Sequence, residues 1–403
     1  MKNYNLLSDA GDLAGKKVLL RAGFDVPMEG GKVADASRIE AVVPTMQFIL
    51  RAGAALIIMS HQGRPDGKVV KEMSQRPLTG ELKKLLGANV EFADDCVGAE
   101  AENAARNLSV GEVLLLENLR FHAEEKANDP DFSAKLASLA DVYVNDAFTN
   151  AHRNHASMVG VTKHLPSYMG LNLQSEVENL SRFTENPKRP VTLVISGKKM
   201  ETKVPVIEGF MEKGDDILLG GCIANTFLAA SGAGVGKSLF ESGGKEQAKA
   251  KELLLESGTE GKATIHIPED AKVAADLSPG AEVRNAGLEE IGAQDSIFDI
   301  GDETAGNYAE IIARSKTIIW NGPAGMSEDE RFSKGTIIIA QAVRKATKKL
   351  AISVIGGGDT IGFHEKYGVS MGDYTFVSTG GGAMLEFLAG EEFPSLAVLE
   401  KKT

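Results

Sequence analysis

The sequence predicts an α/β protein of two domains with mainly parallel sheets, joined by a connecting helix. The chain has 403 residues, more than a single hydrophobic core usually accommodates. Short β-branched or leucine-rich runs alternate along it with segments of helical patterning. Such alternation is typical of parallel sheets that are covered by helices on both faces.

Ten apolar runs are predicted to be strands, and one longer segment is predicted to connect the domains. Residues 168–183 have helical apolar spacing, and the sequence Asn-Pro-Lys-Arg-Pro at 186–190 ends that pattern. We therefore expect an N-terminal domain over residues 1–168, and a C-terminal domain that begins with this helix and covers 169–388. The predicted strands are residues 18–20, 55–59, 113–116, 142–144, 191–195, 217–219, 264–267, 317–320, 352–355 and 375–377.

Composition and charge exclude several classes of protein. The net charge of −12 argues against nonspecific binding to nucleic acid or to acidic membranes. The two cysteines, Cys96 and Cys222, lie far apart without metal-ligand spacing, which fits a reducing cytoplasm better than a disulfide framework or a zinc site. No apolar run approaches the length of a membrane span, and the first twelve residues resemble no targeting signal.

The residues that follow the predicted strands differ between the two halves of the chain. In open α/β sheets, ligands bind beyond the carboxyl ends of the strands. Strands of the N-terminal half are followed by arginines, whereas most strands of the C-terminal half are followed by glycines. We expect the arginines to line a basic cleft that binds phosphate or carboxylate, although any single one could form a surface ion pair. These arginines are Arg21, Arg38, Arg64, Arg120 and Arg153.

The clearest glycine-rich turn is Gly356-Gly357-Gly358-Asp359-Thr360, directly after an apolar run. If a helix begins near Asp359, its free backbone N–H groups form a phosphate site, and the Asp359 carboxylate can hold a divalent cation. A tight packing turn is an equally good interpretation of this stretch alone. Two anionic ligands on facing domains would suggest transfer of a charged group, and phosphoryl transfer needs no serine or cysteine nucleophile.

Three other patterns are weaker. Val235-Gly236-Lys237-Ser238 resembles the end of a P-loop, but Ser231 stands where that motif needs glycine. No glycine cluster opens a first βαβ unit in the way a dinucleotide fingerprint requires. His61, His122, His152 and His155 are interpreted as hydrogen-bond partners or anion contacts more readily than as zinc ligands, although His152 and His155 could share a helix face.

Along almost its whole length the chain resembles the phosphoglycerate kinases. The motifs that carry this resemblance occur in the family order, so chance similarity is very improbable. They are residues 18–21 through 26–27, 37–39, 59–65, 115–122, 145–148, 151–153, 320–323, 356–360 and 378–383.

The resemblance implies a reversible transfer of the ATP γ-phosphoryl group to the carboxylate of 3-phosphoglycerate, which gives 1,3-bisphosphoglycerate and forms ATP in glycolysis. It also implies two Rossmann-like three-layer αβα domains with a hinge, the tail 389–403 packing back on the N-terminal domain. The enzyme would be a cytoplasmic monomer that uses magnesium and binds neither nucleic acid nor membranes.

Residue roles also follow from the resemblance. Arg38, Lys199 and Lys203 would be catalytic. Arg38 would stabilise the transferring phosphoryl group, Lys199 and Lys203 would face the nucleotide phosphates and the transferring group, and Asp359 would hold magnesium. The substrate-binding residues would be Gly23, Asp25, Arg38, His61, Gly63, Arg64, Arg120 and Arg153. The nucleotide-binding residues would be Gly197, Lys199, Lys203, Gly221, Asn321, Pro323, Glu328, Gly357, Gly358, Asp359 and Thr360.

The chain departs from the family pattern at both expected sites. Gly23 replaces an aspartate that contacts the substrate hydroxyl in the family, Asp25 replaces an asparagine, and Thr149-Asn150 replaces Gly-Thr. Ser196-Gly197-Lys198-Lys199 stands for Gly-Gly-Ala-Lys, Cys222 for a glycine, and Asp302 for a proline. These changes leave acceptor affinity and the choice between ATP and GTP open. Two alternatives also stay open: a relative that binds ligands without turnover, and a nicotinamide-dependent oxidoreductase.

Overall fold

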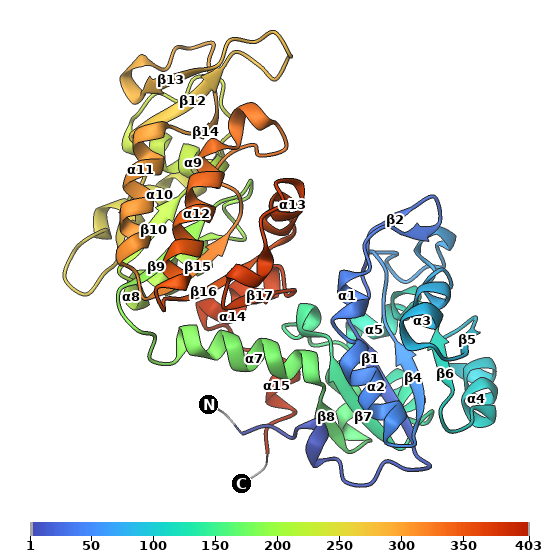
Figure 1. Ribbon diagram of the computed structural model, residues 1–403. Coiled ribbons are helices and arrows are strands. Elements are labelled where there is room, and N and C mark those ends of the chain that lie inside the picture. The colour runs from blue at the N-terminus through green and yellow to red at the C-terminus, as the bar shows by residue number, and fades with distance from the viewer. Residues whose placement is uncertain (1–2, 402–403) are drawn as a thin grey trace. The chain divides into compact units, whose positions relative to one another are not determined.

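The computed structural model describes residues 3–401, which divide into two compact units (Figure 1). The N-terminal unit runs to Glu178 and is joined by the described residues from Glu392 onward. The C-terminal unit is Asn179–Glu391. The boundary falls within helix α7 (Leu171–Thr184), whereas the sequence predicts it at residue 168.

The N-terminal unit contains a six-stranded parallel sheet with the order β5-β6-β4-β1-β7-β8. Because all strands run the same way, the residues that follow them meet at one edge of the sheet. The strands are β1 (Lys17–Ala22), β4 (Ala55–Met59), β5 (Val90–Ala93), β6 (Val113–Leu116), β7 (Val142–Asp146) and β8 (Ser167–Met169). A short hairpin, β2 (Met28–Glu29) and β3 (Lys32–Val33), follows β1.

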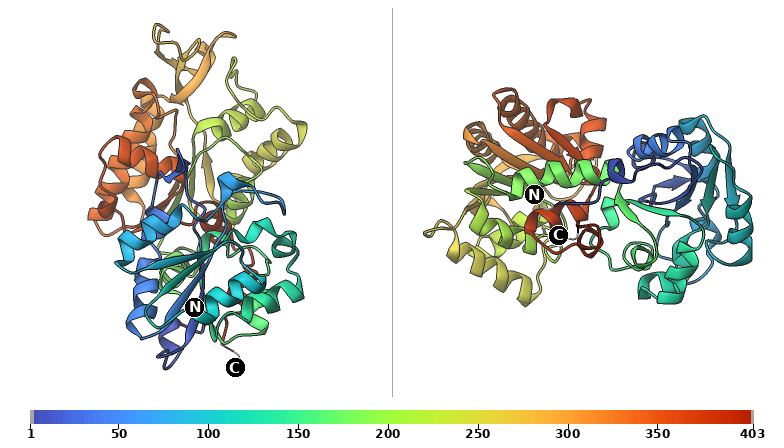
Figure 2. Two further views of the ribbon diagram at one scale, coloured as in Figure 1. Left: turned by 90° about the vertical axis from the view of Figure 1, so that its right-hand side faces the viewer. Right: turned by 90° about the horizontal axis from the view of Figure 1, so that it is seen from below.

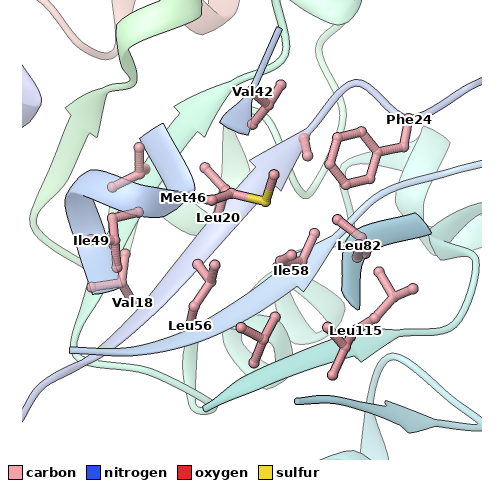
Figure 3. Packing of buried hydrophobic residues seen from close by; sticks show 14 of the residues in the cluster. Val18, Leu20, Phe24, Val42, Met46, Ile49, Leu56, Ile58, Leu82 and Leu115 are labelled. Carbon is pink, nitrogen blue, oxygen red and sulfur yellow. The ribbon is translucent and has the colours of Figure 1, made fainter. Parts of the chain in front are cut away.

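Helices cover both faces of this sheet. Helices α1 (Ser37–Glu40), α2 (Val43–Arg51) and α3 (Leu78–Leu86) contribute to one apolar core, in which Met46 lies against Leu20 (Figure 3). Helices α4 (Gly98–Asn107) and α6 (Pro130–Ala137) contribute Ala101 and Leu136 to the core on the opposite face. The short helix α5 (Ala123–Ala127) precedes α6.

The C-terminal unit contains a second six-stranded parallel sheet, with the order β11-β10-β9-β15-β16-β17. Trp320 is fully buried in the core between this sheet and α11 to α13. The strands are β9 (Val191–Ile195), β10 (Asp216–Leu219), β11 (Thr264–His266), β15 (Thr317–Asn321), β16 (Ile352–Gly356) and β17 (Phe376–Ser378). The helices are α8 (Val204–Lys213), α9 (Gly221–Ser231), α10 (Gly244–Glu256), α11 (Asp302–Arg314), α12 (Lys334–Lys348), α13 (Gly358–Lys366) and α14 (Gly382–Ala389).

The two ends of the described chain lie side by side (Figure 2). Tyr4 forms a β-bridge with Glu400, and the Asn5 N–H donates to the Leu399 carbonyl at 2.9 Å. The short helix α15 (Pro394–Ala397) packs in the N-terminal unit, where Ser395 Oγ donates to the Ala151 carbonyl at 2.8 Å.

The predicted fold class is confirmed, and each of the ten predicted strands is a strand. The predicted helix at 168–183 is wrong at its start, because residues 167–169 form β8, which pairs with β7. His152 and His155 share no helix, since the chain between them is turn and coil. Strands β5 and β8 and a three-stranded antiparallel sheet, β13 (Arg284–Gly287), β12 (Asp270–Ala274) and β14 (Ser296–Ile300), were not predicted.

Among the described residues, no helix combines the length and the apolar character that crossing a lipid bilayer requires.

Candidate active site

The glycine turn between β16 and α13 forms the N-terminus of a helix, as predicted. Gly357 has a φ of 99°, a conformation that favours glycine, and a Cβ there would lie 2.6 Å from Asn321 Nδ2. The Asn321 side-chain amide donates to the Gly356 carbonyl at 2.7 Å. The Gly322 N–H donates to Thr360 Oγ1 at 2.8 Å. The end of β15 therefore fixes a turn whose free N–H groups begin α13, which is the geometry of an anion site.

Three lysines face this turn across a cavity of about 340 Å³. Lys198 and Lys199 are exposed, whereas Lys203 is partly buried and donates a hydrogen bond to Asn321 Oδ1. Burial lowers the Lys203 pKa to about 8, against the opposing effect of the Asp359 carboxylate. The cavity therefore combines cationic side chains with backbone donors, as a polyphosphate requires.

Most of the predicted nucleotide residues line this cavity. Gly197 and Gly357 to Thr360 do so with the two predicted lysines and Asn321. Gly221, Pro323 and Glu328 do not line it. Gly221 approaches Gly197 from the start of α9, and the Glu328 carbonyl accepts a hydrogen bond from Lys366. Lining residues that the site prediction left out are Ser196, Lys198, Thr202, Gly322, Gly381, Gly382 and Leu385.

Basic and polar residues gather at the carboxyl edge of the N-terminal sheet. Asp25 Oδ1 accepts from the Gly63 N–H at 2.9 Å, and the Asp25 backbone carbonyl accepts from Arg38 Nη1. Arg120 Nη1 donates to the Gly63 carbonyl at 2.9 Å. The loops after β1, β4 and β6 are therefore tied together, and residues about 100 apart in the sequence become neighbours.

The ionisation of this basic cluster is dominated by burial and by the neighbouring cations. Burial, followed by the charges of Arg21 and Arg153, lowers the Arg120 pKa to about 10, against the opposing effect of Asp25 and Glu125. The His152 pKa falls to about 4 and the His155 pKa to about 3, in each case through burial first and the nearby arginines second. Both histidines are therefore neutral near pH 7. Arg64 and Arg153 are exposed and carry charge to the surface.

Arg21 corrects one sequence prediction. It was expected to line a basic cleft, but it is fully buried and 0% exposed. Its Nε donates to Ser157 Oγ at 2.9 Å, and its Nη2 lies 3.0 Å from His61 Nδ1. The prediction failed because strand alternation does not reveal that the last residues of a fully covered strand are still inside the protein.

Gly23 is closely packed against Thr149. A Cβ at Gly23 would lie 2.8 Å from Thr149 Oγ1, so the threonine hydroxyl occupies space that a side chain at position 23 would need. The two departures from the family pattern are therefore sterically linked. Thr149 is a candidate site residue that the site prediction missed, and the simultaneous change at both positions was the only signal for it.

A third cluster joins Asp95, Cys96 and His122, whose potential ligand atoms lie within 4.8 Å of one another. Asp95 Oδ1 already accepts from the Cys96 N–H at 2.6 Å, and His122 Nε2 lies 2.7 Å from the same oxygen. Burial raises the pKa of the Cys96 thiol well above its ordinary value. Hydrogen bonding accounts for this arrangement without a metal ion.

Comparison with known proteins decides the family. The sequence model described as "Phosphoglycerate kinase" matches residues 7–391. The chain belongs to the phosphoglycerate kinase family. The resemblance inferred from its motifs is thereby confirmed, and the chain is an enzyme of the kinase class.

Individual phosphoglycerate kinases are similar over nearly the whole chain. That of Moorella thermoacetica is 44% identical over 391 residues, which are 97% of this chain and 98% of the relative. That of Chloroherpeton thalassium is 44% identical over 387 residues, 96% of each. The solved structure from Coxiella burnetii has a TM-score of 0.86 at 37% identity, and that from Pyrococcus horikoshii 0.85 at 34%; each match covers 98% of both chains.

Proposed function

We propose that this kinase carries out its reaction, the reversible transfer of the ATP γ-phosphoryl group to the carboxylate of 3-phosphoglycerate, with the two groups of residues described above. The observation that carries the proposal is the cavity in which Lys199, Lys203 and the N-terminus of α13 converge. A carboxylate acceptor is ionised near pH 7, so the transfer needs alignment and charge stabilisation rather than a general base.

The basic cluster of the N-terminal unit is assigned to the acceptor. His61, Gly63, Arg64, Arg120 and Arg153 bind the phosphate and carboxylate of 3-phosphoglycerate, with the backbone at Gly23 and Asp25 forming the adjacent wall. Arg38 stabilises the negative charge of the transferring phosphoryl group. Its guanidinium, held at the Asp25 carbonyl, is only partly buried and retains further donors for a ligand.

The cavity of the C-terminal unit is assigned to the nucleotide. Lys199 and Lys203 neutralise its phosphates, and Gly357 to Thr360 bind them through backbone N–H groups and the helix end. Gly197, Gly221, Asn321 and Pro323 border the nucleotide, and Glu328 contacts the ribose.

Asp359 is the proposed magnesium ligand. Its carboxylate is exposed in the first turn of α13 beside the proposed phosphate site, and a carboxylate oxygen with substrate phosphates is the ligand set that magnesium prefers. When bound, the ion neutralises phosphate charge that develops during transfer. Lys203 and the α13 N–H groups then orient the same phosphates.

We also propose that the enzyme is a monomer of a reducing cytoplasm that uses ATP and ADP and binds neither nucleic acid nor membranes. Both cysteines are free thiols, which supports the reducing compartment. Light scattering of purified protein at several concentrations tests the monomer, and a mass that rises with concentration would contradict it.

A coupled assay with 3-phosphoglycerate and either ATP or GTP tests the proposed reaction. We expect magnesium-dependent turnover with ATP, and the GTP rate reports the effect of Lys198 and Cys222. If folded protein gives no turnover with either nucleotide while calorimetry still shows binding, the chain is instead a binding-only relative, the alternative that Gly23 and Lys198 motivate.

A further inference from the structure

Arg21 lies at the centre of a buried polar chain behind the proposed acceptor site. Its three nitrogens are directed to three different partners: Nε to Ser157 Oγ, Nη1 to the Ala22 carbonyl, and Nη2 to His61 Nδ1. The side chain is fully buried, so it cannot itself contact a ligand in this conformation.

A buried carboxylate balances the guanidinium through Ser157. Ser157 Oγ accepts from Arg21 and donates to Glu125 Oε1 at 2.6 Å, and the Ser157 N–H donates to Glu125 Oε2 at 2.9 Å. Tyr143 Oη donates to the Ser157 carbonyl at 2.8 Å, which fixes the serine from its other side. Glu125, Ser157 and Arg21 therefore hold one another in place, and little freedom remains for Nη2.

The contact between Arg21 and His61 determines which ring nitrogen carries the proton. A guanidinium has five N–H donors and no acceptor, so His61 Nδ1 must be the acceptor at 3.0 Å. A neutral imidazole has one donor and one acceptor nitrogen, and its proton then resides on Nε2. A second proton on Nδ1 would place two donors against each other.

The surroundings of His61 also oppose its protonation. Burial lowers its pKa well below the ordinary value, and the charges of Arg21, Arg120, His155 and Arg38 act in the same direction. Asp25 is the facing anion, but its Oδ2 lies 3.7 Å from His61 Nε2, beyond hydrogen-bond distance. The Nε2–H therefore has no hydrogen-bond partner among residues 3–401, although the His61 side chain is buried.

We propose that Arg21 is a positioning residue that holds His61 in the neutral Nε2–H tautomer, so that His61 presents an N–H donor to an anionic oxygen of the acceptor substrate. The acceptor's identity rests on the proposed function, whereas the tautomer rests on the buried contact alone. The basic residues of this unit therefore differ in role, because Arg21 acts indirectly, by fixing the tautomer of the neutral His61 ring.

Nitrogen NMR of protein labelled with ¹⁵N-histidine tests the tautomer directly. The chain has seven histidines, and the signals of His61 are assigned by their loss in His61→Gln. We expect a protonated Nε2 and an unprotonated Nδ1 that show no transition near the ordinary histidine pKa. A protonated Nδ1, or a transition near an ordinary histidine pKa, would overturn the proposal.

Substitution of Arg21 tests its role in binding. Arg21→Met removes the donor, so we expect a mixture of tautomers and a KM for 3-phosphoglycerate that is about twofold higher for an equal mixture, because only the Nε2–H form donates to the substrate, with a smaller effect on kcat. Arg21→Lys keeps a donor and should restore the Nε2–H tautomer. Arg21→Met with Glu125→Gln avoids an unpaired buried carboxylate if the single variant does not fold.

The outcomes separate this inference from the proposed function. An inactive wild-type enzyme with the Nε2–H tautomer would refute the proposed reaction and leave the positioning of His61 intact. An active enzyme in which Arg21→Met changes the tautomer but not the KM would refute the role of the tautomer in acceptor binding.

Discussion

Lys203 is the residue whose charge state couples the candidate nucleotide site to pH. It is partly buried, donates to Asn321 Oδ1, and has a pKa of about 8, whereas lysine in water titrates above pH 10. The protonated side chain supplies the positive charge that the nucleotide phosphates need. The ammonium is therefore retained at pH 7 and lost as the pH rises through 8.

Loss of the Lys203 charge should make kcat/KM for ATP depend on pH. We expect kcat/KM for ATP to be level around pH 7 and to fall above pH about 8, as the free enzyme loses the Lys203 proton. Lys203→Arg should have a lower rate but no decline in this range, because a guanidinium does not deprotonate there. An identical decline in the wild type and in Lys203→Arg would assign the transition to another group.

Gly357 sets the geometry of the turn that begins α13. In Gly357→Ala, the new methyl group would meet Asn321 Nδ2 and the positive φ would be strained, so we expect ATP binding to weaken by about tenfold or more. Gly362→Ala is the matched control, because Gly362 lies in the same helix and a methyl group there would meet no neighbouring atom within 4 Å. Calorimetric titration with ATP measures both, and equal affinities would contradict the proposed role of the turn.

At the start of helix α7, a buried carboxyl group makes stability depend on pH. Asp146, at the end of β7, accepts from the Leu173 N–H at 2.7 Å and thereby caps the first turn of α7. Burial raises the pKa of Asp146 to about 7, against the opposing effect of hydrogen bonds from the Thr45 side chain and from the Leu173 and Asn172 N–H groups. A neutral carboxylic acid is therefore favoured in the folded protein below pH 7.

The sign of the resulting pH dependence is fixed by linkage. Because the folded pKa is above the unfolded value, the stabilisation is complete below pH about 4 and is lost as the pH rises towards 7, by at most about 1.4 kcal/mol per pH unit. Asp146→Asn should remove this component of the slope. Urea unfolding at pH 5, 6 and 7 measures it, and parallel pH dependences of the two proteins would show that Asp146 does not titrate there.

Some strands and turns could be predicted from the sequence, and others could not. Strands such as β4 and β9 were predictable because every residue in them is apolar or β-branched and buried. Strand β8 was not, because Ser167 and Tyr168 are only partly buried and its pairing with β7 comes from tertiary structure. The turn at Gly357 was predictable from its glycines, whereas the buried position of Arg21 depends on Ser157 and Glu125, which are distant in sequence.

At the scale of the whole molecule, the chain end stabilises the unit in which the chain begins. Leu396 and Leu399 are buried, and the Phe393 ring lies 5.9 Å from that of Phe148. Each buried leucine contributes about 2 kcal/mol from burial alone. The C-terminal tail is therefore part of the N-terminal unit, although the whole C-terminal unit separates them in sequence.

Truncation after Glu391 tests this contribution. We expect the amides of β1 and β7 to lose hydrogen-exchange protection, because their unit loses the buried tail. The single tryptophan, Trp320, reports the C-terminal unit, so its fluorescence transition in urea should change far less. If hydrogen exchange and Trp320 fluorescence report equal destabilisation, the tail does not stabilise the N-terminal unit separately from the C-terminal unit.

We propose that each unit carries its own anion site, one for the acceptor and one for the nucleotide. Calorimetric titration of two exposed-residue variants tests it most directly, since Arg153 and Lys199 are replaceable without opening a core. We expect Arg153→Ala to weaken 3-phosphoglycerate binding about tenfold and to leave ATP binding unchanged, and Lys199→Met to do the reverse. Two separate anion sites would be contradicted if either substitution weakened the binding of both ligands equally, or if neither weakened the binding of its own ligand.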